Sequence, residues 1–178
     1  MMRSVAIAIA GAVLLTGAAH AEVVDAQPGG FEVKRTVQIA APPLTVMTAL
    51  SHPERWWSSA HSWSGKASNM HMDARGGGCW CESLPETRGE VRHMTVIYYD
   101  PGGTIRLDGG LGPLQQTGAS GRLTWVWAAK DGGTEVTWTY DVGGYMRGGL
   151  APLAPAVDGV LAEQMGRLKK LLETGKPE

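Results

Sequence analysis

The sequence has few cysteines, little net charge and a single phenylalanine. Two cysteines among 178 residues exclude the dense disulfide framework that stabilises many small secreted domains. The 16 basic and 17 acidic side chains nearly cancel, and the formal net charge is −1. We therefore expect no binding to nucleic acid and no broad electrostatic attraction to anionic lipid.

Motifs of several common catalytic sites are missing as well. The chain contains no Gly-x-Ser-x-Gly nucleophile turn, no His-Glu-x-x-His metal-binding helix and no phosphate-binding loop of the glycine-rich kind. It also has no internal repeat and no low-complexity tract. We predict no cofactor, and we favour a binding protein over an enzyme while leaving enzymatic activity open.

The N-terminus has the three parts of a secretory signal peptide. Arg3 supplies the positive charge, residues 5–15 form the apolar segment, and residues 19–21, Ala-His-Ala, match a small-residue cleavage site. The apolar segment is about half the ~20 residues that a membrane-spanning helix needs. We therefore expect cleavage after residue 21, export to the periplasm or the medium, and no stable membrane insertion. Residues 22–30 are expected to be a flexible lead-in.

Hydrophobic periodicity outlines one α+β domain over residues 31–175. Apolar and polar residues alternate over residues 31–41, which indicates a half-buried strand, and the following prolines can begin a short helix that ends near Leu50. A second short helical segment is expected at residues 54–58. Six strand-like segments separated by turn signals follow, at residues 63–72, 78–84, 91–99, 104–108, 116–128 and 134–142.

The C-terminal part of the sequence predicts a long amphipathic helix. Apolar residues recur at helical spacing from Leu150 to Leu172, and Pro152 and Pro155 place the regular helix from about Ala154 onward. Successive strands joined by short turns form an antiparallel meander. The predicted architecture is a helix-grip fold, in which a curved sheet of about seven strands wraps around the C-terminal helix and leaves a cavity between them.

Several short motifs, taken in order, resemble the SRPBCC superfamily of START-like helix-grip domains, which includes lipid-transfer domains, polyketide cyclases and the heat-shock ATPase activator. The motifs are residues 37–43, the pair 56–57, the glycine-rich entry to 79–82 and the pair 100–101. Residues 93–94, 111–115, 143–145 and 153–158 further resemble an exported bacterial branch of the superfamily. The resemblance implies that the cavity holds an apolar or amphipathic small molecule, although a shared fold does not transfer a reaction. We expect a monomer or a weak homodimer.

Aromatic side chains are the predicted lining of that cavity. Tryptophan and tyrosine greatly outnumber phenylalanine, and their rings combine an apolar surface with one hydrogen-bonding group. The last two predicted strands carry such rings at a clear period of two. The predicted ligand-binding residues are Trp56, Trp57, Trp80, Trp125, Trp138 and Tyr140.

Two side chains are candidates for acid–base chemistry of the cyclase or dehydratase kind. Glu82 lies on the same strand face as Trp80, and if this face points inward, burial raises the pKa of its carboxyl group. His93 is the second candidate. The alternative for Glu82 is a hydrogen-bonded structural carboxylate near the end of its strand. A cavity enzyme that uses Glu82 or His93 is therefore the second functional hypothesis.

The two cysteines, Cys79 and Cys81, lie one residue apart and share a face of the predicted strand. A hairpin turn centred on Thr87 places Cys81 opposite His93, and the two thiols and the imidazole then form a set suited to zinc or copper. A register shift by one residue sends His93 to the Glu82 face instead. The ligand set therefore depends on the register.

Three interpretations of the cysteines stay open: packed small residues, a redox-active or disulfide-bonded pair, and a metal site. We favour the arrangement in which Trp80 and Glu82 point inward and the cysteines lie on the convex side, because the indole is the better core group. In the run 70–72, alternation separates His71 from its two methionine neighbours, and we predict that the methionines fill the core rather than bind copper.

Overall fold

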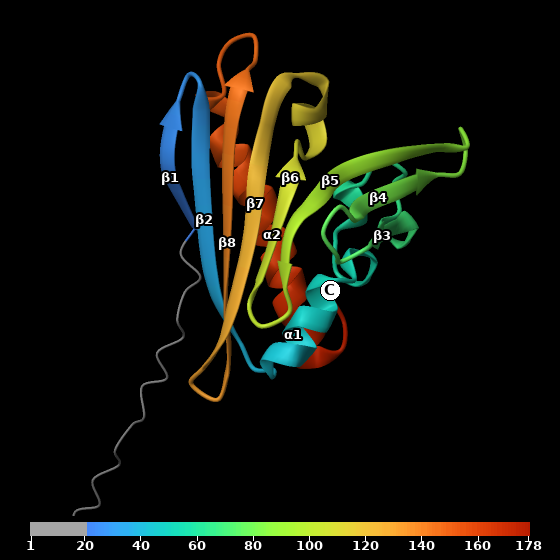
Figure 1. The fold of residues 1–178 in the computed structure, drawn as a ribbon, viewed down its shortest axis with the longest axis vertical. Helices are drawn as coiled ribbons and strands as arrows, with labels where there is room; N and C mark the ends of the chain where they lie inside the picture. The colour runs from blue at the N-terminus through green and yellow to red at the C-terminus, as the bar shows by residue number, and fades with distance from the viewer. Residues whose placement is uncertain (1–20) are drawn as a thin grey trace, which may run out of the picture.

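The computed structural model describes residues 21–178, which form one eight-stranded antiparallel sheet and two α-helices (Figure 1). The signal peptide predicted for residues 1–21 lies outside the described residues except for Ala21. The strands are β1 (Ala21–Gln27), β2 (Gly30–Ile39), β3 (Met70–Met72), β4 (Cys79–Leu84), β5 (Gly89–Asp100), β6 (Thr104–Gly109), β7 (Gly118–Lys130) and β8 (Gly133–Tyr145). The helices are α1 (Pro43–Leu50) and α2 (Ala154–Thr174), and the 3₁₀ turns are η1 (Pro53–Arg55), η2 (Ser59–His61), η3 (Ala67–Asn69), η4 (Gly112–Gln116) and η5 (Ala151–Leu153).

The strand order in the sheet is β1-β2-β8-β7-β6-β5-β4-β3, so the chain runs as a meander from β3 to β8 and then returns beside β2. Helix α2 lies along one face of the sheet, and the β4–β5 hairpin projects away from the other strands (Figure 1). This arrangement confirms the predicted α+β helix-grip architecture. The predicted start of the long helix at Ala154 is also confirmed.

The alternating pattern of β7 and β8 packs one face of each strand into the core. Leu123 and Trp125 on β7 are buried opposite Tyr140 and Trp138 on β8, whereas the residues between them are more exposed. Apolar residues at every second position are buried because successive side chains of a strand point to opposite faces.

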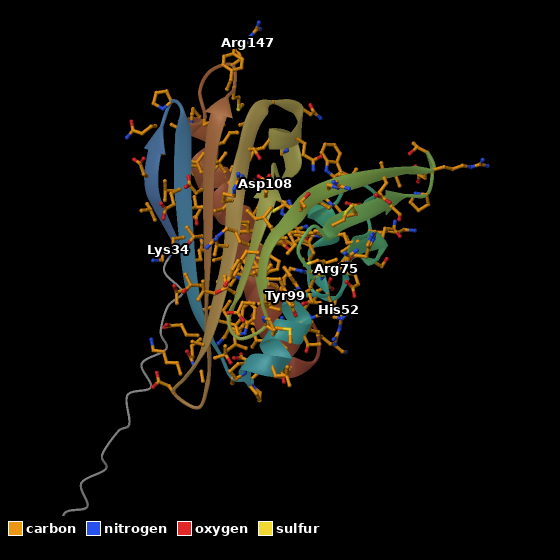
Figure 2. The ribbon with its side chains drawn as sticks, viewed as in Figure 1. Lys34, His52, Arg75, Tyr99, Asp108 and Arg147 are labelled. Carbon is orange, nitrogen blue, oxygen red and sulfur yellow. A yellow bond between two sulfur atoms is a disulfide. The ribbon has the colours of Figure 1, made fainter. Side chains whose placement is uncertain are left out.

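Tyr99 on β5 contacts α1, where its hydroxyl donates to the Met47 sulfur at 3.5 Å (Figure 2).

Polar contacts at both ends fix α2 on the sheet. The guanidinium of Arg35 on β2 donates two hydrogen bonds of 2.8 Å to the carboxylate of Asp158, and both groups are largely buried. Near the other end, the backbone amide of Ala40 donates to Glu173 at 3.0 Å. The helix ends at Gly175, whose φ of 82° suits a glycine cap. Across residues 21–178, no helix is long and apolar enough to span a membrane.

Two sequence predictions about the strands are wrong. Residues 22–30 were expected to be a flexible lead-in, but they contain most of β1, whose irregular register between Val23 and Asp25 interrupts the period-two pattern. The strand predicted at residues 63–72 is reduced to β3, because the preceding polar, serine-rich segment forms turns that include η3. The sheet has eight strands, and the additional strand beyond the seven expected is β1.

Five tryptophan rings fill the space between the sheet and the helices. Their centroids are separated by 4.9 Å to 6.0 Å in neighbouring pairs, mostly in edge-on or tilted arrangements. The rings belong to Trp56, Trp57, Trp80, Trp125 and Trp138. The Trp56 indole donates to the Ala49 carbonyl at 2.8 Å, whereas three of the other indole N–H groups have no acceptor among residues 21–178. This cluster occupies the centre of the fold and displaces any cavity toward one end.

Candidate functional site

A cavity of about 610 Å³ lies between the segment 57–63, η4 and the N-terminal part of α2. Its walls are mostly apolar, and its volume falls in the range of about 300–1,000 Å³ that small-molecule sites occupy. The lining residues are Trp57, Ala60, His61, Ser62, Trp63, His93, Leu111, Gly112, Pro113, Leu114, Gln116, Leu153, Ala156, Val157, Val160 and Leu161. The site is therefore an apolar pocket with few polar groups.

The η4 wall is tied to the sheet by the hydroxyl of Tyr140. This hydroxyl donates to the Gly109 carbonyl at 3.0 Å and accepts from the Leu111 amide at 3.1 Å. Burial raises the pKa of Tyr140 to about 12, so the hydroxyl keeps the proton that it donates. A side chain at Gly109 would bring its Cβ within 2.6 Å of the His93 carbonyl. The glycine therefore allows this loop to lie close to β5.

The opposite wall, segment 57–63, is fixed to α2. The backbone amide of Ser58 donates to the Gln164 side-chain oxygen at 2.7 Å, and Gln164 is fully buried. The Arg167 guanidinium donates to the Trp56 carbonyl at 2.9 Å. Within the segment, the Trp57 indole donates to the His61 carbonyl at 2.8 Å, which holds the ring against the cavity. Both walls are thus held by a few polar contacts to regular elements.

Glu82 and His93 form a buried pair at the cavity wall. The distance from the Glu82 Oε2 atom to the His93 Nε2 atom is 2.9 Å, and the two residues are 0% and 5% exposed. The carboxylate also accepts hydrogen bonds from the backbone amides of Trp63 at 3.1 Å and Ser64 at 2.6 Å. His93 lines the cavity, so the imidazole of this buried acid–base pair faces the apolar pocket.

The pKa shifts of the pair assign its protonation at neutral pH. Burial raises the pKa of Glu82, but the hydrogen bonds from Ser64, Trp63 and His93 outweigh it and lower the pKa overall. Burial lowers the pKa of His93, against the opposing effect of Glu82. Glu82 is therefore ionised and His93 neutral. An ionised carboxylate only accepts, so the His93 proton sits on Nε2, and Nδ1 carries a lone pair.

The structure confirms the predicted orientation of β4 but not the predicted ligand set of the cysteines. Trp80 and Glu82 point inward, as expected. A register irregularity after Trp80 places Cys81 opposite Arg92, and His93 joins Glu82 on the inner face. Of the two placements of His93 left open by the sequence, the one on the Glu82 face is therefore observed, and His93 does not join the thiols. The alternative given for Glu82, a hydrogen-bonded structural carboxylate, is the one observed: backbone amides that no sequence pattern marked stabilise its charge and hold its pKa below the ordinary value.

Of the six predicted ligand-binding residues, only Trp57 lines the cavity. Four indoles and Tyr140 are instead packed in the core, the latter as the anchor of η4. The sequence analysis missed the apolar wall contributed by α2, whose members include Val157 and Leu161. They belong to the apolar stripe of the predicted helix, and the stripe alone does not separate residues that face a cavity from residues that pack.

We predict that His93 makes the folded state less stable as the pH falls below neutral. Its folded-state pKa is lowered, so its contribution to stability is complete above the ordinary value of 6.5 and is lost as the pH falls toward the lower folded-state pKa. Glu82, whose pKa is also lowered, adds a loss that begins near its ordinary value of 4.5. His93→Gln should show a smaller fall in Tm between about pH 7 and pH 5 than the wild type.

The matched control is His71→Gln, at an exposed histidine on β3, which should retain the wild-type fall in Tm. Thermal unfolding followed by circular dichroism at several pH values gives the comparison. An equal fall in the wild type and in His93→Gln would contradict the assignment.

Residues 30–173 match the model of the family described as polyketide cyclase/dehydrase and lipid transport. The comparison with curated proteins gave no match. Similar solved structures include a conserved protein of unknown function, EF2215 from Enterococcus faecalis, at 13% identity, covering 89% of this chain and 78% of that chain, with a TM-score of 0.60. CalU16 from Micromonospora echinospora has 11% identity, coverage of 90% and 87%, and a TM-score of 0.59.

The Aha1 dimer from Colwellia psychrerythraea is also similar, at 17% identity, with coverage of 82% and 98% and a TM-score of 0.50. At these identities the structural likeness shows the fold alone. The family match spans most of the sequence and agrees with the architecture of the sheet and α2. The chain therefore belongs to the polyketide cyclase/dehydrase and lipid-transport family.

Proposed function

We propose that the protein binds one apolar or amphipathic small molecule in the cavity between η4, segment 57–63 and α2. The observation that carries the proposal is the combination of about 610 Å³ of space, mostly apolar walls and a single buried polar pair. At ~30 Å³ for each group of the size of a water molecule, this volume holds a ligand of about 20 such groups. Membership of a family that includes lipid transport supports a ligand of this class.

The polar contact of such a ligand is expected at His93. Because Glu82 holds the proton of the ring on Nε2, the Nδ1 lone pair can accept a hydrogen bond from a hydroxyl or amine of the ligand. The apolar part of the ligand then packs against Val157 and Leu161 on α2. Trp63, which lines the cavity and is 44% exposed, lies where the site meets solvent. An amphipathic molecule with one hydrogen-bond donor fits this arrangement best.

We predict that Val157→Trp blocks the cavity. The larger side chain occupies ligand space, and the apparent affinity for the fluorescent probe N-phenyl-1-naphthylamine should fall by about tenfold or more, equivalent to ~1.4 kcal/mol. Val126→Trp is the matched control, because Val126 is 44% exposed on β7 and does not line the cavity. Fluorescence titration measures both variants after circular dichroism has verified their folding. Equal affinities in the two variants would rule out this cavity as the binding site.

A second candidate function, proton transfer in the cavity, is favoured by the Glu82–His93 pair. The Nδ1 atom of neutral His93 can remove a proton from a carbon next to a carbonyl group of a bound molecule, and the Glu82 carboxylate stabilises the imidazolium that forms. The same nitrogen can return the proton to a leaving hydroxyl, which departs as water. Cyclisations and dehydrations use such steps.

We predict that, if the protein is an enzyme of this kind, it catalyses hydrogen–deuterium exchange at the carbon next to the carbonyl of an aryl ketone such as 1-tetralone in D₂O. General-base catalysis contributes about 10²–10⁴-fold, and His93→Gln should remove it. His71→Gln is the control that should leave the exchange rate unchanged. Proton NMR follows the exchange. A wild-type rate equal to that of buffer, or one unaffected by His93→Gln, would exclude the catalytic role.

We also propose that the protein is exported and acts as a mature chain from Glu22 onward. Loss of residues 1–21 would remove only the first residue of β1, and the pairing of Glu22 with Lys34 and of the rest of β1 with β2 would be retained. The exported bacterial branch that the sequence resembles supports the same compartment.

If the protein is exported, the expected product is a mature chain whose first residue is Glu22 and whose mass is that of residues 22–178. Intact-mass spectrometry of the periplasmic or secreted fraction of a Gram-negative host should detect this species. The full-length chain found only in the cytosol would contradict the proposal.

A further inference from the structure

A second cluster of ligand-type side chains lies on β3 and β4, on the face of β4 opposite to Trp80 and Glu82, where Cys81 is buried and His71 is exposed. Cys79 and Cys81 on β4 are joined as a disulfide, with their Cα atoms 5.5 Å apart. In a regular strand, Cα atoms two residues apart are separated by about 6.6 Å. The Cα atoms of Cys79 and Cys81 are closer than this, at the point where the register between β4 and β5 is irregular. His71 on β3 lies directly opposite Cys81. In one of the two registers left open by the sequence the thiols lie beside His93, but the histidine opposite Cys81 is His71.

The three side chains have the donor atoms of a metal site. The ring nitrogen of His71 and the two sulfur atoms all lie within 4.8 Å of one another. Ligands of a tetrahedral zinc ion, at about 2.3 Å for sulfur and 2.0–2.1 Å for nitrogen, are separated by roughly 3.6–3.8 Å. Once the disulfide is reduced, side-chain rotations alone can bring the three donor atoms from their present distances to those required around zinc.

We propose that the reduced form of the protein binds a Zn²⁺ ion through Cys79, Cys81 and His71. Two thiolates and one imidazole favour zinc over magnesium and calcium, which prefer oxygen ligands. His71 is exposed, Cys79 is partly exposed and Cys81 is buried, so the ion would be reached from the side of His71 and Cys79. On the other side of β4, Arg92 on β5 is the residue paired with Cys81.

The disulfide makes this site dependent on redox state. A thiolate of the pair attacks a low-molecular-weight disulfide, one thiol of the oxidant leaves, and the second cysteine displaces the other thiol from the mixed disulfide. In balance, two cysteine thiols and one small disulfide give the Cys79–Cys81 bond and two small thiols. The cysteine sulfurs lose the two electrons that the oxidant gains. Zn²⁺ departs because both of its sulfur ligands are consumed.

The zinc site is independent of the ligand cavity in position and in chemistry. Trp80 and Glu82, which alternate with the cysteines along β4, point to the inner face of the sheet, and none of the three zinc ligands lines the cavity. Zinc binding and ligand binding can therefore be measured separately, and failure of one leaves the other standing.

The test uses the chain from Glu22 onward, reduced with a phosphine and freed of reductant and oxygen. Titration with Zn²⁺ against a chromophoric chelator should give one ion per chain, and Co²⁺ in its place should give the near-ultraviolet absorption of thiolate coordination. Oxidised glutathione should then release the bound zinc in step with loss of the two thiols. Oxidised protein should bind no zinc at this site.

Two variants separate the proposed site from binding by the thiols alone. His71→Gln should weaken zinc binding by roughly tenfold or more, because it removes one of three protein ligands. His52→Gln is the control, since His52 is exposed and lies outside the cluster. Absence of stoichiometric zinc binding by the reduced wild type would overturn the proposal. Equal affinities of His71→Gln and the wild type would overturn it as well.

Discussion

The carboxylate of Glu82 is the buried charge on which the cavity wall depends. Removing an ion from water costs several kcal/mol unless the protein replaces the lost hydrogen bonds. Here the replacements come from the amides of Trp63 and Ser64 and from His93. Because these donors come from β5 and from the segment after η2, their contacts with Glu82 hold both to β4. That arrangement turns His93 toward the pocket.

The other walls follow the same principle, in which a few polar contacts position a stretch of apolar surface. Tyr140 holds η4, Gln164 holds the segment 57–63, and the Arg35–Asp158 pair holds α2. Each contact is buried or nearly so, and each joins a loop or helix to an element that is distant in sequence. The cavity is therefore formed by the fold itself and does not require a ligand to assemble it. A preformed apolar site avoids the entropy of ordering loops during binding.

Much of the fold could be predicted from the sequence because periodicity reports which side of an element is buried. The period of two in β7 and β8, the start of α2 at Ala154 and the inward face of Trp80 were all correct. Irregular backbone caused the errors. The interrupted register of β1 concealed a strand, and the irregular register between β4 and β5 moved His93 to the opposite face. Such irregularities carry no composition signal in this chain.

The candidate site was harder to predict than the fold, because a cavity is defined by the space that side chains leave. Most of the tryptophans expected to line the cavity pack against one another instead, and the cavity lies beside η4 and α2. The polar pair at its wall depends on the register of the β4–β5 hairpin, which the sequence left open between two alternatives, and on the amides of a loop. Neither is visible as a spacing motif. Side-chain chemistry at the site therefore became clear only with the tertiary structure.

A crystal structure of the protein with a bound apolar probe such as N-phenyl-1-naphthylamine tests the central claim most directly. The account predicts electron density for one probe molecule between η4 and α2, with the amine of the probe at His93 and its rings against Val157. The Glu82 contacts should be unchanged from the protein without the probe. A probe bound elsewhere, or a pocket closed by side chains, would contradict the account.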